Sequence, residues 1–180
     1  MSDEKQALRA HMRAERDAFA MASDSTIAPP APFLERLRSG VIVASYIPVG
    51  SEADPTALAA AARAAGAVLA LPHVERRDGE MRFLAWGDDD PLPIGTFGLR
   101  QPVTSARECA PDIVLTPLVA FDDALNRLGQ GAGFYDRAFA RVPGAWRLGI
   151  AWSVQQLLMI DPDPWDVPLH AVVTDRGMVR

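Results

Sequence analysis

Short apolar runs and amphipathic segments alternate along the chain of 180 residues. Several of the runs are rich in β-branched residues and are too short for buried helices, so they predict strands. The predicted strands lie at 41–49, 67–72, 81–86, 112–121, 147–152 and 171–175. The other segments predict helices at 2–19, 33–40, 56–66, 133–141 and 153–158. Ser2, followed by the acidic Asp3 and Glu4, is typical of a helix start.

The order of these elements predicts the fold class. A strand, an alanine-rich helix and a second strand follow one another within 41–72, which is a βαβ unit and implies parallel pairing. Asp54 and Pro55 favour the start of that helix, and Gly66 favours its end. We therefore expect an α/β protein with a single open, mainly parallel Rossmann-like sheet and helices on both faces, formed as one domain by residues 1–180.

Composition and charge exclude several classes of function. The net charge of −5 argues against a nucleic-acid partner, and no apolar run approaches the length of a membrane span. The single cysteine, Cys109, cannot form an internal disulfide, and no Cys/His cluster has the spacing of a metal site. The N-terminal segment is charged throughout, unlike a signal peptide. We expect a cytoplasmic protein, either a monomer or a small homo-oligomer.

A glycine-rich stretch, RLGQGAGFYDR at 127–137, is the clearest candidate for a binding site. Its G-x-G-x-G spacing matches neither the P-loop nor the dinucleotide-binding fingerprint. Alternating glycines still allow backbone N–H groups to surround an anion, and the helix that follows adds its positive end. Arg127 would place a fixed charge at the entrance, and Asp136 would cap the helix or hold a divalent cation. The alternative is an ordinary flexible turn before a helix.

The ordered set of motifs resembles the 5-formyltetrahydrofolate cyclo-ligase family, also called methenyltetrahydrofolate synthetase. The resemblance covers nearly the whole chain, and the order and spacing of its motifs are more specific than any one of them. The motifs are KQALR at 5–9, YIPVGSEADPTAL at 46–58, AVLALPHV at 67–74, IGTFGLRQP at 94–102, RLGQGAGFYD at 127–136, LGIAWSVQQ at 148–156 and WDVPLHAVVTD at 165–175.

The resemblance implies an ATP-dependent ring closure with Mg²⁺ as the metal. In the family's reaction 5-formyltetrahydrofolate and MgATP give 5,10-methenyltetrahydrofolate, ADP and phosphate. The formyl oxygen attacks the γ-phosphorus, and N10 of the folate then attacks the activated carbon. ATP is needed because an amide-like oxygen is a poor leaving group. An enzyme of this kind contributes mostly positioning and charge neutralisation.

The resemblance also implies a role for individual residues, with Arg127 as the catalytic residue. Nucleotide-binding roles fall on Lys5, Arg9, Arg127, Leu128, Gly129, Gln130, Gly131, Ala132, Gly133, Phe134 and Tyr135. Folate-binding roles fall on Ile47, Glu52, Gln130, Gly131, Ala132, Gly133 and Phe134. The implied magnesium ligands are Asp136 and Asp166.

Each of these residues also has a structural interpretation. Lys5 and Arg9 also fit a solvated helix face, Glu52 and Asp166 fit capping or turn carboxylates, and Tyr135 fits a core-packing residue. Three aromatic residues are possible walls of a pterin pocket but are more typical of a core: Trp86, Phe97 and Trp152.

The chain departs from the family's pattern at three positions, which are Gln130, Ala132 and His170. Two other functions therefore stay open at this point. One is a sugar-phosphate isomerase-like enzyme that binds substrate phosphate at the glycine loop and uses Asp136 or Glu52 as its base. The other is a non-catalytic nucleotide- or folate-binding protein on the same fold.

Overall fold

The protein, described from a computed structural model that covers residues 3–180, is built on a seven-stranded sheet with the order β3-β2-β1-β4-β7-β8-β9. The strands are β1 (Ile42–Ala44), β2 (Val68–Val74), β3 (Met81–Ala85), β4 (Ile113–Pro117), β7 (Trp146–Ile150), β8 (Ala171–Thr174) and β9 (Gly177–Val179). The five central strands pair in parallel, whereas β3 and β9 pair antiparallel at the two edges. The prediction of an open, mainly parallel sheet is therefore confirmed.

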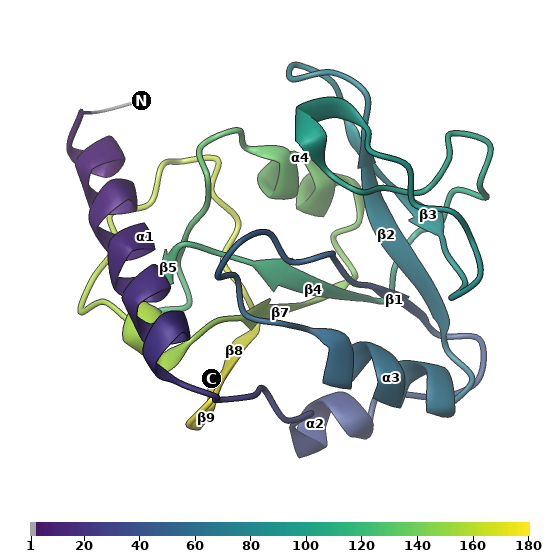
Figure 1. Ribbon diagram of the computed structural model, residues 1–180, viewed down its shortest axis with the longest axis horizontal. Helices are drawn as coiled ribbons and strands as arrows, with labels where there is room; N and C mark the ends of the chain where they lie inside the picture. Colours follow the sequence, from purple (N-terminus) through teal and green to yellow (C-terminus); the bar gives the residue numbers. More distant parts are fainter. Residues whose placement is uncertain (1–2) are drawn as a thin grey trace.

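Helices cover both faces of this sheet (Figure 1). They are α1 (Asp3–Ala22), α2 (Ala31–Leu34), α3 (Thr56–Ala64) and α4 (Phe134–Arg141), with 3₁₀ turns η1 (Thr96–Gly98) and η2 (Ser153–Gln155). A small hairpin of β5 (Ala120–Phe121) and β6 (Arg127–Leu128) lies beside α1 and leads into the glycine loop.

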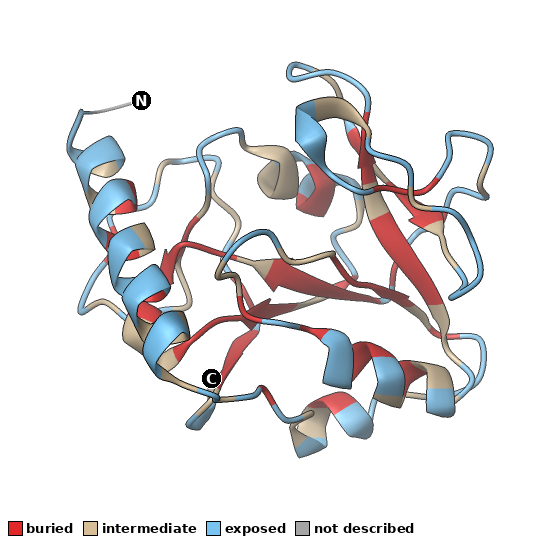
Figure 2. Cartoon of the chain, viewed as in Figure 1, coloured by how far each residue is buried: buried red, intermediate tan, exposed pale blue. Residues whose placement is uncertain are grey.

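Two hydrophobic clusters form because successive side chains of each strand point to opposite faces. One cluster packs Val43, Leu115 and Leu148 against α2 and α3, and the other packs Ala44 and Val114 against α4. Figure 2 shows the buried residues concentrated in the central strands. The sheet is a rigid layer, and the loops at the carboxyl ends of its strands provide the side chains of the site.

Several predicted boundaries are wrong in detail. The predicted strand 41–49 ends at Ala44, and its remainder belongs to a loop that continues through the left-handed Gly50, with φ of 60°. The predicted strand 112–121 divides after Pro117, which has no N–H to continue a ladder. The predicted helices 33–40 and 153–158 shorten to α2 and η2. Strand β9 was not predicted, and Ser2 lies outside the described residues.

The longest helix, α1, is the nearest candidate for a membrane span by length alone. Its 20 residues include many charged side chains. Within residues 3–180, no helix has both the length and the apolar composition needed to cross a bilayer.

Candidate functional site

Helix α1 presents a row of basic side chains to the loops of the sheet. Lys5, Arg9 and Arg13 are four residues apart, and Arg16 follows three residues later, so all four lie along one stripe of the helix. Met12 is 2% exposed and packs in a cluster with Leu128 of β6, which docks α1 beside the glycine loop. The stripe therefore combines an apolar anchor with cations that reach three different loops.

Lys5 and Arg9 contact the two ends of the predicted nucleotide site. The Lys5 ammonium lies 2.8 Å from a carboxylate oxygen of Asp163 and 4.0 Å from one of Asp166. Arg9 is 8% exposed, and its Nε donates a hydrogen bond of 2.8 Å to the Gly129 carbonyl. The Nη1 group of Arg9 is buried and has no hydrogen-bond partner among residues 3–180. A buried free donor beside a glycine loop is suited to an anionic ligand.

Burial lowers the pKa of Arg9, and the nearby Arg13 lowers it further, whereas Asp163 and Asp166 oppose the shift. Burial and the neighbouring Arg13 thus make the charged form of Arg9 less favourable. A bound phosphate chain would stabilise that charged form.

The glycine loop connects β6 to α4 in a conformation that requires glycine. Gly131 and Gly133 adopt positive φ values of 95° and 67°. Gly133 is the N-cap of α4, and no side chain caps the helix. The first N–H groups of α4 therefore lack a side-chain acceptor at the cap, as in other helix starts that bind anions.

Arg127 lies beneath this loop rather than at its entrance, so the prediction of an entrance charge is wrong. Its side chain is 4% exposed and forms an ion pair of 2.7 Å with Asp136. The guanidinium also lies 5.1 Å from the centre of the Phe139 ring. Burial lowers the pKa of Arg127, while Asp136 and Asp166 raise it. The charge is held rigidly, as electrostatic catalysis requires.

The two predicted metal ligands belong to segments that the fold brings together. One oxygen of Asp136 accepts hydrogen bonds from Arg127, at 2.7 Å, and from the backbone N–H of Val167, at 3.1 Å. Asp166 precedes Val167, and one of its oxygens accepts from the Asp163 N–H at 2.8 Å. No group of three potential metal-binding side chains occurs within residues 3–180.

These carboxylates fit Mg²⁺ that arrives with phosphate. The side chains of Asp136 and Asp166 are 15% and 24% exposed, and the hydrogen bonds that each accepts from other described residues fall on a single oxygen. Mg²⁺ in phosphate sites commonly takes one or two protein carboxylates and completes its shell with phosphate and water. The arrangement therefore suits a metal delivered by its nucleotide and does not form a closed protein cage.

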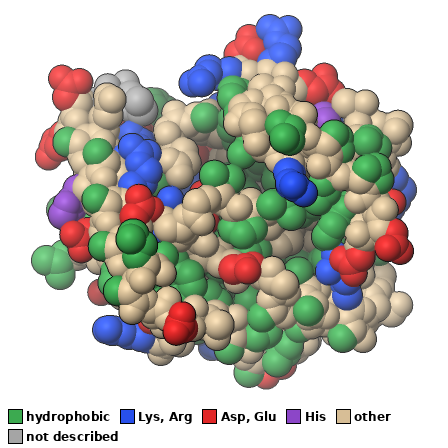
Figure 3. Space-filling view, viewed as in Figure 1, with side chains coloured by type: hydrophobic (Ala, Val, Ile, Leu, Met, Phe, Trp, Pro, Cys, Tyr) green, Lys and Arg blue, Asp and Glu red, His purple; other side chains and the backbone are tan. Residues whose placement is uncertain are grey.

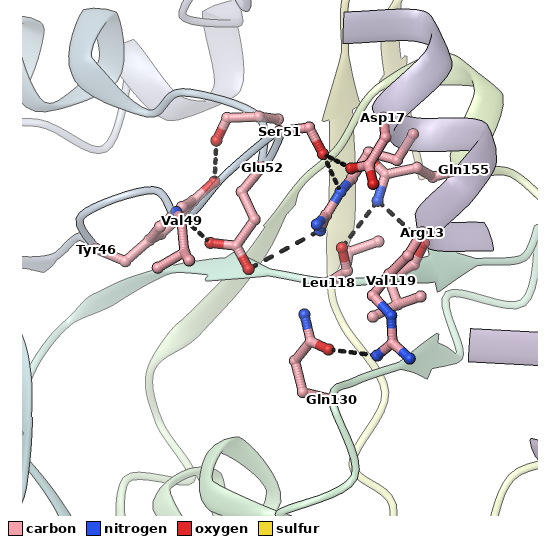
Figure 4. Close-up of polar contacts among 12 residues, drawn as sticks. Arg13, Asp17, Tyr46, Val49, Ser51, Glu52, Leu118, Val119, Gln130 and Gln155 are labelled. Atoms are coloured by element: carbon pink, nitrogen blue, oxygen red, sulfur yellow. Dashed lines mark hydrogen bonds and ion pairs between the residues drawn. The ribbon is translucent and has the colours of Figure 1, made fainter. Parts of the chain in front are cut away.

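Glu52 lies in the segment after β1, in the same region as Gln130 of the glycine loop (Figure 4). One of its oxygens accepts from the Val49 N–H at 3.0 Å, and the other lies 3.9 Å from Arg16. Burial raises the pKa of Glu52, whereas hydrogen bonds from Val49 and Gln130 and the charge of Arg16 oppose the rise. Glu52 is thus a partly desolvated acceptor, able to bind the N–H groups of a polar heterocycle.

Arg13 and Arg16 were not predicted as site residues, yet both support this region. Arg13 donates a hydrogen bond of 3.0 Å to the Gln130 side chain, and Arg16 donates one of 2.9 Å to the Ser51 hydroxyl. Gln130 therefore contacts the basic stripe of α1, and it lies close enough to Glu52 to lower the pKa of that carboxyl. The repeat of basic residues after Arg9 is a signal in the sequence that would have identified them.

The remaining predicted residues differ in what their side chains can reach. Leu128 is 3% exposed in the cluster beneath α1, so only its backbone is available to a nucleotide. Tyr135 packs 5.9 Å from the Phe139 ring, in agreement with its structural interpretation. Ile47 and Phe134 are half-buried, and Ala132 is exposed. Their binding roles are predictions from the sequence.

The three aromatic residues divide between core and surface. Trp152 is 8% exposed and donates to the Ser51 carbonyl at 2.9 Å, so it supports the Glu52 segment. Trp86 lies under the guanidinium of Arg63, in the cluster beside α3. Phe97 is 43% exposed and lies 6.2 Å from the Phe134 ring, so the interpretation of Phe97 as a core residue is wrong.

His170, one of the three departures from the family's pattern, has a structural contact. Its Nδ1 accepts a hydrogen bond of 2.9 Å from the Arg147 N–H. Burial lowers the pKa of His170, and Arg147 and Arg36 lower it further. The imidazole is thus engaged with β7.

Comparison with known proteins agrees with this geometry. The family model described as the 5-formyltetrahydrofolate cyclo-ligase family matches residues 1–175. A 5-formyltetrahydrofolate cyclo-ligase of Mycolicibacterium smegmatis is 36% identical over 151 residues, which cover 78% of this chain and 77% of that protein. The one of Haemophilus influenzae is 37% identical over 101 residues, but the match spans only 51% of this chain and 52% of that protein.

A solved structure shares the fold. The solution structure of the 5,10-methenyltetrahydrofolate synthetase of Aquifex aeolicus has a TM-score of 0.74 and 27% identity, covering 98% of this chain and 92% of that one.

Proposed function

The chain belongs to the 5-formyltetrahydrofolate cyclo-ligase family, and from that premise we propose that it closes 5-formyltetrahydrofolate to 5,10-methenyltetrahydrofolate at the expense of ATP. One observation carries the proposal. The loop around Gln130 lies between the cations of α1 and the carboxylate of Glu52. A phosphate chain and a folate have to meet in this way if the formyl oxygen is to reach the γ-phosphorus.

The proposed reaction proceeds in two steps. The formyl oxygen attacks the γ-phosphorus of ATP, and ADP leaves with the electrons of the broken P–O bond. N10 then attacks the formyl carbon and gives up its proton to the departing phosphate, which leaves with the former formyl oxygen. Lys5, Arg9 and Arg127 offset the charge of the phosphates, and Glu52 accepts hydrogen bonds from the pterin. The backbone of the glycine loop aligns the two reacting atoms.

We further propose that Asp136 and Asp166 hold Mg²⁺ together with the nucleotide phosphates. When bound, the metal would neutralise phosphate charge and restrict the phosphates to one arrangement. The Asp136 oxygen that accepts from Arg127 and Val167 fixes the orientation of this carboxylate.

The alternative functions are not favoured. An isomerase base needs a carboxylate free to take a proton, whereas Asp136 is ion-paired with Arg127. Family membership supports an enzyme over a non-catalytic binding protein. A single domain, a cytoplasmic location, a monomer or small homo-oligomer and the absence of a nucleic-acid partner remain parts of the proposal, supported by the single large sheet and the acidic composition.

The experiment is a direct absorbance assay of the product. Purified protein at neutral pH with 5-formyltetrahydrofolate and MgATP should produce the near-ultraviolet absorbance of the methenyl product. Omission of ATP should abolish the rise, and protein unfolded by heat is the blank. Turnover of a sugar phosphate without ATP or metal would instead support the isomerase alternative.

A further inference from the structure

Two arginines and two phenylalanines form a continuous ladder on the opposite side of the glycine loop from α1. The Arg77 guanidinium lies 5.4 Å from the Phe97 ring centre, and the Phe97 and Phe134 rings are 6.2 Å apart. The Arg137 guanidinium lies 5.1 Å from the centre of the Phe134 ring. Figure 3 shows this face of the molecule hollowed between the side chains of α1 and those of the loops opposite.

The ladder is fixed to the glycine loop and to the β2–β3 hairpin. Arg137 donates a hydrogen bond of 2.9 Å to the Ala132 carbonyl, and its other Nη donates one of 3.4 Å to the Gly79 carbonyl. Thr96, beside Phe97, donates to the Glu75 carbonyl at 2.8 Å. A ligand that leaves the loop at Phe134 therefore meets side chains that are already in place.

The ladder carries positive charge that its surroundings do not neutralise. The neighbouring cations are paired: Arg76 with Asp78 at 3.0 Å, and Arg82 with Glu75 at 2.8 Å. Arg141 of α4 pairs with Glu80. In contrast, no carboxylate in the described part of the chain, residues 3–180, forms an ion pair with Arg77 or Arg137. Two guanidiniums that carry no carboxylate partner favour a ligand with more than one anionic group.

Phe97 is held at the surface in an unfavourable backbone conformation. Its φ is 64°, in the left-handed region that residues with a side chain rarely adopt, and its side chain is 43% exposed. Burial in the core therefore does not explain why the ring is there. Strained residues that present an exposed side chain next to a binding loop are typical of ligand contacts.

We propose that this ladder, defined as Arg77, Phe97, Phe134 and Arg137, binds the aminobenzoyl-glutamate end of the folate. The inference rests on the proposed function, because it assigns one end of the same substrate. The aromatic rings suit the aryl amide, and the guanidiniums of Arg77 and Arg137 suit the carboxylates that follow it. The pterin end then lies toward Glu52, across the glycine loop. Extra glutamates on the tail would add carboxylates within reach of Arg77.

The test compares the monoglutamate and triglutamate forms of 5-formyltetrahydrofolate in steady-state assays. We expect Arg77→Ala to raise KM for the triglutamate by about two- to fivefold more than KM for the monoglutamate, as for a solvent-exposed charge pair. Added salt should shrink the difference. Arg76→Ala is the matched control, because Arg76 is the adjacent exposed arginine but is paired with Asp78. Equal changes for both tail lengths in Arg77→Ala, or the same differential in Arg76→Ala, would overturn the proposal.

A binding measurement separates this inference from the proposed function. The probe is p-aminobenzoyl-triglutamate, titrated into the protein and followed by calorimetry without ATP. We expect Phe97→Gly, which removes the ring but keeps a residue suited to positive φ, to weaken binding, and Arg76→Ala to leave it unchanged. Normal ring closure by the wild-type protein, with no difference between these variants, would refute the ladder but not the reaction. Loss of ring closure with intact fragment binding would refute the reaction.

Discussion

Two partly or fully desolvated charges, Glu52 and Arg127, are held by different means. Arg127 has a full ion pair with Asp136, which opposes the lowering of its pKa by burial. Glu52 has only a distant cation, Arg16 at 3.9 Å, and a backbone donor, so its pKa rises. At the scale of single residues, the site therefore contains one compensated charge and one under-compensated charge.

Replacement of Arg127 should affect both stability and turnover. We expect Arg127→Met to lower kcat/KM by about 100-fold or more, because a preorganised charge near the phosphates is lost. The unpaired Asp136 should also reduce the free energy of unfolding by about 3 kcal/mol. Steady-state kinetics and urea unfolding measure the two effects. Arg141→Met, which removes an exposed cation of α4, should change neither by a comparable amount, and a folded Arg127→Met variant with wild-type kinetics would exclude Arg127 from the site.

The pKa of Glu52 predicts a pH dependence with a definite sign. Its folded value lies above the ordinary 4.5, so between the two values the folded state binds the proton more tightly than the unfolded state. The free energy of unfolding of the wild-type protein relative to Glu52→Gln should therefore fall as pH rises through that window. Urea unfolding of both proteins across mildly acidic pH measures the difference. Asp54→Asn is the nearby control, and a relative stability that rose with pH would contradict the raised pKa.

Helix α1 is the element on which the site depends most. Its cations contact three loops, but the helix touches the rest of the protein through few apolar side chains, with Met12 the most buried of them. The spacing of Lys5, Arg9 and Arg13 along one face is visible in the sequence. Their partners are not, because Arg9 bonds to a carbonyl 120 residues away and no local pattern encodes that distance.

Truncation of Met12 should therefore loosen the nucleotide site without touching a charge. We expect Met12→Ala to destabilise the protein by about 2–4 kcal/mol, as for other large-to-small core changes, and to raise KM for ATP several-fold. Met21→Ala is the control on the same helix, because Met21 is 89% exposed. Thermal unfolding and ATP titration measure the two effects. Equal behaviour of both variants would show that the docking of α1 does not support the site.

At the scale of the whole molecule, the open sheet brings the N-terminal helix, the loop at 129–133 and the carboxylates near the C-terminus into one region (Figure 1). The parallel sheet was predictable because its strands are short apolar runs joined by a clear helix at 56–64. The edge strand β9 was not, because its three residues lack a strong apolar pattern. Family motifs supplied most of the candidate residues, whereas the roles of Arg13, Asp163 and Phe97 depend on tertiary contacts.

The central claim is that one site joins ATP and a folate, and the formation of the methenyl product tests it most directly. With 5-formyltetrahydrofolate and MgATP at neutral pH, the methenyl product, measured by its near-ultraviolet absorbance, should form in the same molar amount as ADP and phosphate. A folded protein that binds ATP but gives no rise in absorbance would contradict the claim. A rise in absorbance without consumption of ATP would contradict it as well.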